Sequence, residues 1–197
     1  MEAEFLQEVT RLFLENGAKT VTMDDVAKKF GMSKKTLYAK YKNKEALIED
    51  VLACKLDGIA ENLKRLNVDS DNAIERLLCR DEQMDEMVKS NDTIMVRQLL
   101  KYYPHIFNKH MKLFSEKISE IFVRNVERGR LQGLYREDFS AESYVHLMLL
   151  MMQAYDNSPI VDSDLISRDA FRDRVIDFYL QAIMTEKGRE EYQQIKK

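Results

Sequence analysis

Residues 23–47 read MDDVAKKFGMSKKTLYAKYKNKEAL, two short amphipathic segments on either side of a Gly-Met-Ser turn. A helix-turn-helix needs a small residue where its helices cross, a glycine at the turn and an apolar residue in its second helix. Ala27, Gly31 and Leu37 supply these residue types in that order. Gly31 can adopt a positive φ at little cost, and Leu37 closes a small core. The stretch therefore predicts a helix-turn-helix.

Residues that cap helix N-termini precede each of these segments. Thr22 and Asp25 have the spacing of a capping box, Ser33 precedes the second helix of the motif, and Asn43 precedes a further helix. Such side chains accept hydrogen bonds from the free N–H groups of a first helical turn. Gly17 is placed to end an earlier apolar helical segment. We therefore expect a three-helix domain over residues 1–47.

Positive charge is concentrated in this domain. Eight lysines and two aspartates lie between Lys19 and Lys44, whereas the whole chain carries a formal net charge of −3. With Leu37 facing inward, its helix presents lysines and a tyrosine that can neutralise phosphates or reach base edges. Lys44 begins the next helix, whose N-terminal N–H groups can share a phosphate with it. A solvated charged face is the alternative, but the spacing, caps and clustered charge together favour DNA binding.

The remaining residues, 48–197, predict only helices. Glycine and proline are scarce, at six and two, which disfavours turn-rich β architectures, and no segment alternates as a strand does. The predicted fold class is all-α with about nine helices, in which a helical dimerisation and effector-binding domain follows the N-terminal domain. The later helices are expected at 44–66, 71–90, 91–103, 104–132, 140–155 and 167–187, the last ended by Gly188.

The N-terminal segment resembles the DNA-binding domain of the TetR family of transcriptional regulators. The resemblance rests on residues 12–17, 22–27, 31–38 and 41–47. It implies a homodimer that reads a roughly palindromic operator in double-stranded DNA and, in most members, a repressor released by a small ligand. Glu2 and Glu4 depart from the basic N-terminal arm of many members, so a minor-groove contact from this end is not expected.

The resemblance also assigns DNA-contacting residues. Positions matching Thr22, Tyr41 and Lys44 commonly touch the phosphate backbone, and positions matching residues 34–36 and Tyr38 commonly approach bases. Together with the outward residues of the motif, the predicted DNA-binding set is Thr22, Ser33, Lys34, Lys35, Thr36, Tyr38, Tyr41, Lys42 and Lys44.

Two apolar stripes near the end of the chain suit the four-helix dimer interface that the family uses. The same stripes could instead form the core of a single chain. The predicted interface residues are Tyr144, Leu147, Met148, Met151, Phe171, Val175, Phe178 and Tyr179.

Polar residues on otherwise apolar helices are candidates for binding a small apolar or amphipathic ligand. For each one alone, an ordinary core or surface residue is the commoner interpretation, because ligand pockets hold few polar groups. The sequence has no metal-ligand spacing, nucleophile elbow or glycine-rich phosphate loop, so we expect no metal, no cofactor and no enzymatic activity. The candidates are Arg97, Gln98, Tyr102, His110 and His146.

The sequence thus predicts a cytoplasmic, ligand-responsive, homodimeric DNA-binding repressor. The alternative is a DNA-binding accessory or recruitment factor without a small-molecule effector, whose second domain only dimerises or binds another protein. The acidic N-terminus is unlike a targeting leader. The longest apolar run, residues 147–152, is far shorter than the roughly 20 residues of a membrane-spanning helix.

Overall fold

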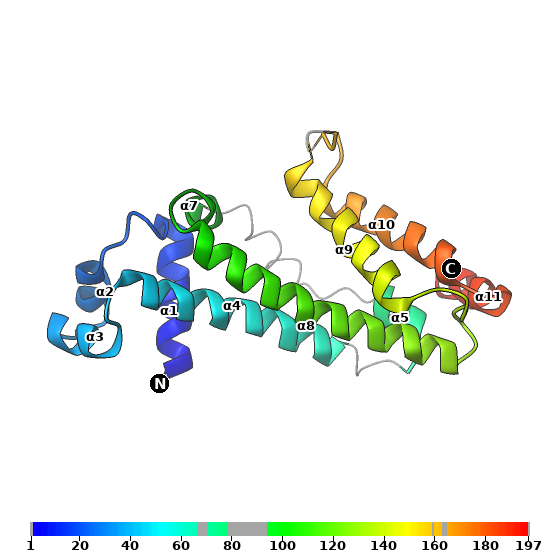
Figure 1. Cartoon of the computed structure of the whole chain (residues 1–197), viewed down its shortest axis with the longest axis horizontal. Helices are drawn as coiled ribbons and strands as arrows, with labels where there is room; N and C mark the ends of the chain where they lie inside the picture. The colour runs from blue at the N-terminus through cyan, green and yellow to red at the C-terminus, as the bar shows by residue number, and fades with distance from the viewer. Residues whose placement is uncertain (1, 67–70, 79–93, 159, 163–164, 197) are drawn as a thin grey trace. The chain divides into compact units, whose positions relative to one another are not determined.

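The computed structural model of the chain describes residues 2–66, 71–78, 94–158, 160–162 and 165–196. Within these ranges it contains ten helices and no strand, which confirms the all-α fold class (Figure 1). The chain forms two compact units. The first comprises Met1–Asn62 and Asp81–Glu116, and the second comprises Leu63–Arg80 and Lys117–Lys197. The division predicted at residue 47 stays a prediction.

The first unit contains the helix-turn-helix and the helices that support it. Val9 and Phe13, which are four residues apart on the first helix, are fully buried. Gly17 ends that helix at a φ of +87°, and its N–H donates to the carbonyl of Phe13 at 2.8 Å. The unit consists of α1 (Glu2–Asn16), α2 (Met23–Lys29), α3 (Lys34–Lys40), α7 (Ile94–Tyr102) and the N-terminal parts of α4 (Lys44–Leu66) and α8 (Pro104–Leu131).

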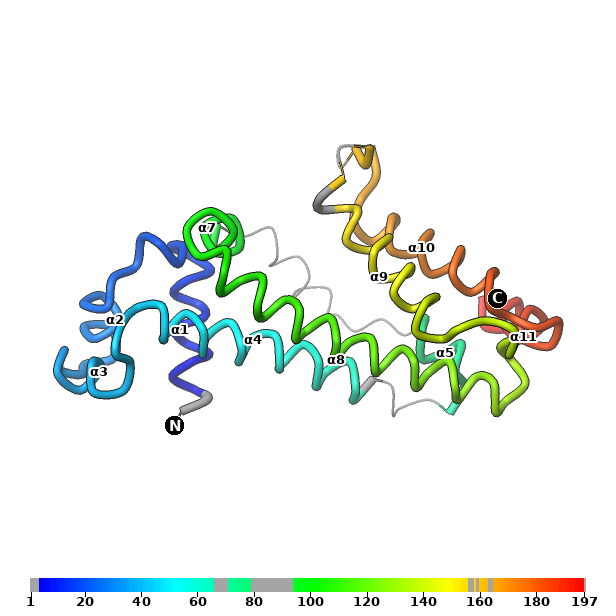
Figure 2. Tube along the Cα trace, in the orientation of Figure 1, coloured from blue at the N-terminus to red at the C-terminus, as the bar shows by residue number. Residues whose placement is uncertain are grey.

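The second unit packs the end of α8 against four further helices: α5 (Ala73–Leu78), α9 (Ala141–Asn157), α10 (Arg168–Ile183) and α11 (Glu186–Ile195). Helices α9 and α10 lie side by side, as the tube trace also shows (Figure 2). Val145, Met148, Leu180 and Ile183 are fully buried in its core. Burial of apolar residues at this spacing on both helices explains why the pair packs together.

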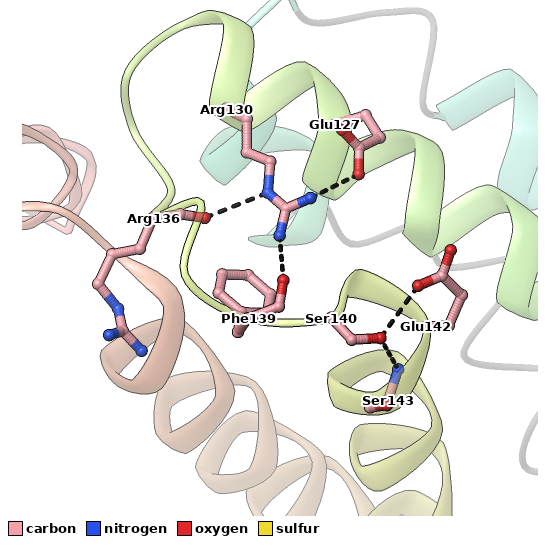
Figure 3. A network of polar contacts seen from close by, with 7 residues as sticks. All are labelled: Glu127, Arg130, Arg136, Phe139, Ser140, Glu142 and Ser143. Atoms are coloured by element: carbon pink, nitrogen blue, oxygen red, sulfur yellow. Dashed lines mark hydrogen bonds and ion pairs between the residues drawn. The ribbon is translucent and has the colours of Figure 1, made fainter.

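A charged side chain fixes the turn between α8 and α9. The guanidinium of Arg130 donates to the carbonyls of Arg136 at 3.2 Å and Phe139 at 2.5 Å, and to Glu127 at 2.8 Å (Figure 3). Ser140 then accepts a hydrogen bond from the N–H of Ser143 at 3.2 Å. Ser140 therefore caps this helix, and Arg130 is one of the side chains that hold the turn before it.

One predicted helix end is wrong. Gly188 was expected to end the helix that begins near residue 167, but α10 ends at Ile183 and a separate helix, α11, begins at Glu186. Thr185 caps α11 by accepting from the N–H of Gly188. Gly188 lies in the first turn of α11, where a β-carbon would collide with the carbonyl oxygen of Leu134. The missing β-carbon of Gly188 therefore allows close packing, and Gly188 does not end a helix.

The other predicted bounds agree with the structure to within a few residues where it describes them. Of the helix expected at 71–90, the structure describes Ala73–Leu78; residues 79–90 of that prediction lie outside the described ranges. None of the helices in the described part of the chain is long and apolar enough to cross a membrane.

Candidate nucleic-acid interface

The first helix of the motif, α2, is fixed by a complete capping box. The N–H of Asp25 donates to Oγ1 of Thr22 at 3.2 Å, and the N–H of Thr22 donates to Oδ2 of Asp25 at 2.9 Å. Hydrogen bonds from the hydroxyl and N–H of Thr22 lower the pKa of Asp25. The carboxylate is thus held ionised at the positive end of α2, which favours the helix start that the sequence predicts.

The turn of the motif has the predicted geometry. Gly31 adopts a φ of +62°, and the N–H of Met32 returns to the carbonyl of Ala27 at 3.0 Å. Ser33 then caps α3 by accepting from the N–H of Thr36 at 3.0 Å. Ala27 and Leu37 are buried, as the helix-turn-helix interpretation requires. These contacts set the rotation of α3 about its axis.

With Leu37 inside, α3 presents a polar and basic face. Ser33, Lys34, Lys35, Thr36 and Tyr38 are all exposed, as is Lys42 just beyond the helix. Tyr38 exposes 48% of its surface, although it is a large aromatic residue. The face combines mobile ammonium groups, hydroxyls and an aromatic ring, which are the groups that contact DNA phosphates, base edges and thymine methyls.

Lys34 is paired within the motif. Its Nζ lies 2.5 Å from Oδ2 of Asp24, the second residue of α2, and both side chains are more than half exposed. This hydrogen bond to Asp24 raises the pKa of Lys34. Asp24 could not be predicted as the partner of Lys34, because a separation of ten residues matches no helical spacing and the pair forms only when α2 and α3 cross.

Lys44 is also engaged. Its Nζ donates to the carbonyl of Lys19 at 2.8 Å. Partial burial, and then the nearby positive charge of Lys19, lower the pKa of Lys44. Asn43 caps the same helix by accepting from the N–H of Ala46 at 2.9 Å. The predicted phosphate site at the start of α4 therefore has an ammonium already oriented by the chain.

Tyr41 differs from the other predicted contacts because it is buried, with 3% of its surface exposed. Its ring stacks on Phe5 of α1 at a centroid distance of 6.2 Å. Lys40, which the sequence analysis did not select, lies with its Nζ 5.1 Å from the ring centroid of Phe5. Tyr41 joins α1 to the end of α3, and its role as a phosphate contact stays a prediction.

The predicted ligand residues differ in exposure and in hydrogen bonding. Arg97 and His146 are exposed, and Tyr102 exposes 45% of its surface. His110 is partly buried, and burial lowers its pKa; its Nε2 has no hydrogen-bond partner among the described residues. The side-chain amide of Gln98 accepts a hydrogen bond from the N–H of Lys19 and donates one to the hydroxyl of Thr20. The ligand assignments stay predictions, and no group of three or more potential metal-binding side chains occurs in the described ranges.

The predicted dimer residues separate into two sets. Met148, Val175 and Tyr179 are buried in the core of the second unit. Leu147 and Phe178 expose 55% and 65% of their surfaces, and Leu150, which was not in the predicted set, exposes 62%. Tyr144, Met151 and Phe171 are intermediate. Of the eight predicted interface residues, Leu147 and Phe178 are thus the exposed ones.

The capped α2 and α3 and the basic, exposed face of α3 are typical of the class of helix-turn-helix DNA-binding proteins. Residues 6–51 match the family described as bacterial regulatory proteins, tetR family. This match confirms the resemblance of the N-terminal segment to the TetR family that the sequence predicts.

Solved structures share the fold over nearly the whole chain. A transcriptional regulator from Cytophaga hutchinsonii has a TM-score of 0.73 at 19% identity, covering 92% of this chain and 97% of its own. The reduced form of NemR from E. coli has a TM-score of 0.68 at 12% identity, with 93% and 97% covered. SmeT, the repressor of the Stenotrophomonas maltophilia multidrug efflux pump SmeDEF, has a TM-score of 0.65 at 16% identity, with 92% and 89% covered. No curated protein matches the sequence.

Proposed function

We propose that this chain is a cytoplasmic transcriptional repressor that binds a palindromic operator as a homodimer and is released by a small apolar or amphipathic ligand. The observation that carries the proposal is the exposed basic face of α3, held by caps at both helices of a TetR-family domain. SmeT, which has the same fold, is by its description a repressor. The protein acts by binding and not by catalysis.

In this proposal α3 lies in the major groove. Lys34, Lys35, Thr36 and Tyr38 approach base edges, since they occupy the exposed face opposite the buried Leu37. Thr22, Ser33, Lys42 and Lys44 contact the phosphate backbone from the ends of the helices. Lys44 contributes together with the N–H groups at the start of α4.

Duplexes selected by the wild-type protein from a randomised pool provide the probe. Replacing Lys35 with alanine removes a cation from the exposed face of α3. We expect at least about 10-fold weaker binding, because a lost side-chain contact to a base edge costs about 1–3 kcal/mol. Lys112→Ala removes an exposed lysine from α8 and should leave the affinity unchanged. Equal binding by Lys35→Ala and wild type would contradict the assigned face.

The homodimer is proposed to form through the exposed apolar residues of α9 and α10. Leu147, Leu150 and Phe178 each expose more than half of their surface, which costs free energy in water and is relieved by burial against a second copy. Phe178→Glu should convert the dimer to a monomer in sedimentation velocity. Leu131→Glu changes a leucine that is 91% exposed at the end of α8 and should leave the dimer intact.

The small ligand separates the proposal from that of an accessory factor without an effector. A ligand that binds the folded state raises the melting temperature by mass action. A thermal-shift panel of apolar and amphipathic compounds should therefore yield at least one stabilising compound that also weakens DNA binding. Stabilisation by none would favour the accessory factor.

A further inference from the structure

Five of the six residues between α1 and α2, Gly17 to Val21, are held by a side chain from a distant part of the sequence. We call these residues the α1–α2 link. Oε1 of Gln98, on α7, accepts a hydrogen bond from the N–H of Lys19 at 2.5 Å, and its Nε2 donates to Oγ1 of Thr20 at 3.3 Å. Both polar atoms of this amide are therefore used by the link, 79 and 78 residues away in the chain.

The packing around this amide is close. A β-carbon at Gly17 would lie 2.5 Å from Oε1 of Gln98 and 2.6 Å from its Nε2, so the amide occupies the space that any other residue would fill. One helical turn further along α7, the ring of Tyr102 lies 5.4 Å from Nζ of Lys19. Helix α7 thus contacts three groups of the link: the backbone N–H of Lys19, the hydroxyl of Thr20 and the ammonium group of Lys19.

The same peptide segment is held from its other side. Nζ of Lys44, at the start of α4, donates to the carbonyl of Lys19 at 2.8 Å. Within the link, the N–H of Val21 donates to the carbonyl of Gly17 at 3.2 Å. Lys19 therefore has its N–H fixed by α7 and its carbonyl fixed by α4, and the next residue after the link is Thr22, which caps α2.

We propose that Gln98 is a positioning residue for DNA recognition: by fixing the N–H of Lys19 it sets the path of the α1–α2 link, and through Thr22 the placement of α2 and α3. The proposal rests on the proposed DNA-binding function. Gln98 itself contacts no DNA. Helix α7 nevertheless belongs to the first unit, which contains the helix-turn-helix, although α7 follows residue 51, where the family match ends.

Gln98→Met tests the hydrogen bonds separately from the packing, because methionine has nearly the same length and volume but no donor and only a weak acceptor. Gln193→Met is the matched control, since Gln193 is an exposed glutamine on α11. Binding is measured by fluorescence anisotropy on a duplex that the wild-type protein selects from a randomised pool. We expect Gln98→Met to bind about 10-fold more weakly, the effect of one or two lost hydrogen bonds.

Two further measurements distinguish positioning from a general packing role. The salt dependence of binding should keep its wild-type slope, because no cation is lost. The Lys19 amide should exchange with solvent faster in Gln98→Met, while core amides of α1 keep their protection. Gln98→Glu retains an acceptor for the Lys19 N–H and should bind more tightly than Gln98→Met.

The outcomes separate the two proposals. If the wild-type protein selects no duplex, the proposed function fails. If the wild type selects a duplex and Gln98→Met binds it equally well, the role of Gln98 is overturned while the function stands. Should Gln98→Met lose helicity, Gln98→Leu also removes the acceptor for the Lys19 N–H; unchanged binding by folded Gln98→Leu would overturn the role as well.

Discussion

The helix starts of α2 and α5 satisfy their free N–H groups in different ways. Helix α2 uses Thr22 and Asp25, three residues apart in the sequence. In α5, Asn72 accepts from the N–H of Ile74 at 2.8 Å, but the N–H of Ala73 donates to Oε1 of Gln132 at 3.0 Å, 59 residues away. The first unit thus builds its DNA-reading helices with local contacts, whereas the second builds its helix starts partly with remote ones.

The same contrast holds for the turns of the second unit. Lys187 donates to the carbonyl of Gln132 at 2.8 Å, and Arg136 donates to the carbonyl of Ala182 at 2.6 Å. Local contacts form as soon as a helix forms, and their spacing is visible in the sequence. Remote contacts exist only after the helices have packed, so each of them depends on the others.

The largest effect should come from Gly188→Ala. The added β-carbon would collide with the carbonyl of Leu134, a backbone atom that cannot move aside without shifting the turn after α8. We expect a loss of about 3 kcal/mol in the unfolding free energy of the second unit. Because the chain has no tryptophan, urea unfolding should be followed by circular dichroism, with hydrogen exchange to assign the loss to α11.

The control for this substitution is Gly58→Ala. Gly58 lies inside α4 with no atom within 4 Å of the β-carbon position, so alanine should stabilise the helix by about 0.5–1 kcal/mol. Destabilisation by Gly58→Ala, or tolerance of Gly188→Ala, would contradict this account of the packing.

A smaller effect separates the local cap from the remote one. Thr22→Ala should cost about 1 kcal/mol and affect mainly α2, because the cap serves one helix. Gln132→Ala removes an acceptor for Ala73 and a donor to the carbonyl of Asp71, and should cost about 1–2 kcal/mol. Hydrogen exchange should show faster exchange in α5 and in its neighbours for Gln132→Ala. If hydrogen exchange became faster only in α5, the remote contacts would depend on one another no more than the local contacts do.

A pH-dependent effect is expected at the junction of α10 and α11. Asp177 accepts hydrogen bonds from the hydroxyl of Tyr192 at 2.5 Å and from Nζ of Lys196 at 3.0 Å, and these lower its pKa. Because the pKa is lower in the folded state, the ionised carboxylate stabilises the fold above pH of about 4 and this contribution is lost as pH falls through the folded value.

Asp177→Asn tests this contribution. The group is partly exposed, so the substitution should cost less than about 1 kcal/mol at pH 7, and the difference from wild type should shrink near pH 3. Urea midpoints measured at both pH values give the comparison. A difference that stayed constant with pH would assign the effect to packing and not to charge.

The smallest effect concerns DNA affinity. Asp24→Asn removes the carboxylate paired with Lys34, which frees one ammonium and deletes one negative charge next to the DNA. Binding should tighten about 2- to 3-fold at low salt, since an exposed pair contributes little. Glu190→Gln, an exposed acid on α11, is the control with the same change in net charge. Equal tightening in both variants would reduce the effect to net charge alone.

The features that could be predicted from the sequence are those set by residues close together in the chain. Thr22, Ser33 and Asn43 were predicted as caps and are caps, because a cap and its helix are neighbours in the chain. Gly188 was misassigned because its role is set by Leu134, more than fifty residues earlier. Val175 and Tyr179 share an apolar stripe with Phe178, and only packing shows that they face the core while Phe178 faces outward.

The candidate DNA-binding face was predictable for the same reason. Leu37 fixes which side of α3 is buried, so its exposed neighbours follow from helical periodicity. The pairing of Lys34 with Asp24 and the bond from Lys44 to Lys19 were not predictable, because they join elements ten or more residues apart.

The close packing of Gly17 against the side-chain amide of Gln98 has a consequence for protein engineering. Chimeric regulators are made by joining the reader of one protein to the sensor of another at a boundary in the sequence. A graft of residues 6–51 alone would leave Gln98 behind and present Gly17 and Lys19 to a foreign helix. A functional graft of this reader therefore requires a glutamine installed at the equivalent place in the recipient.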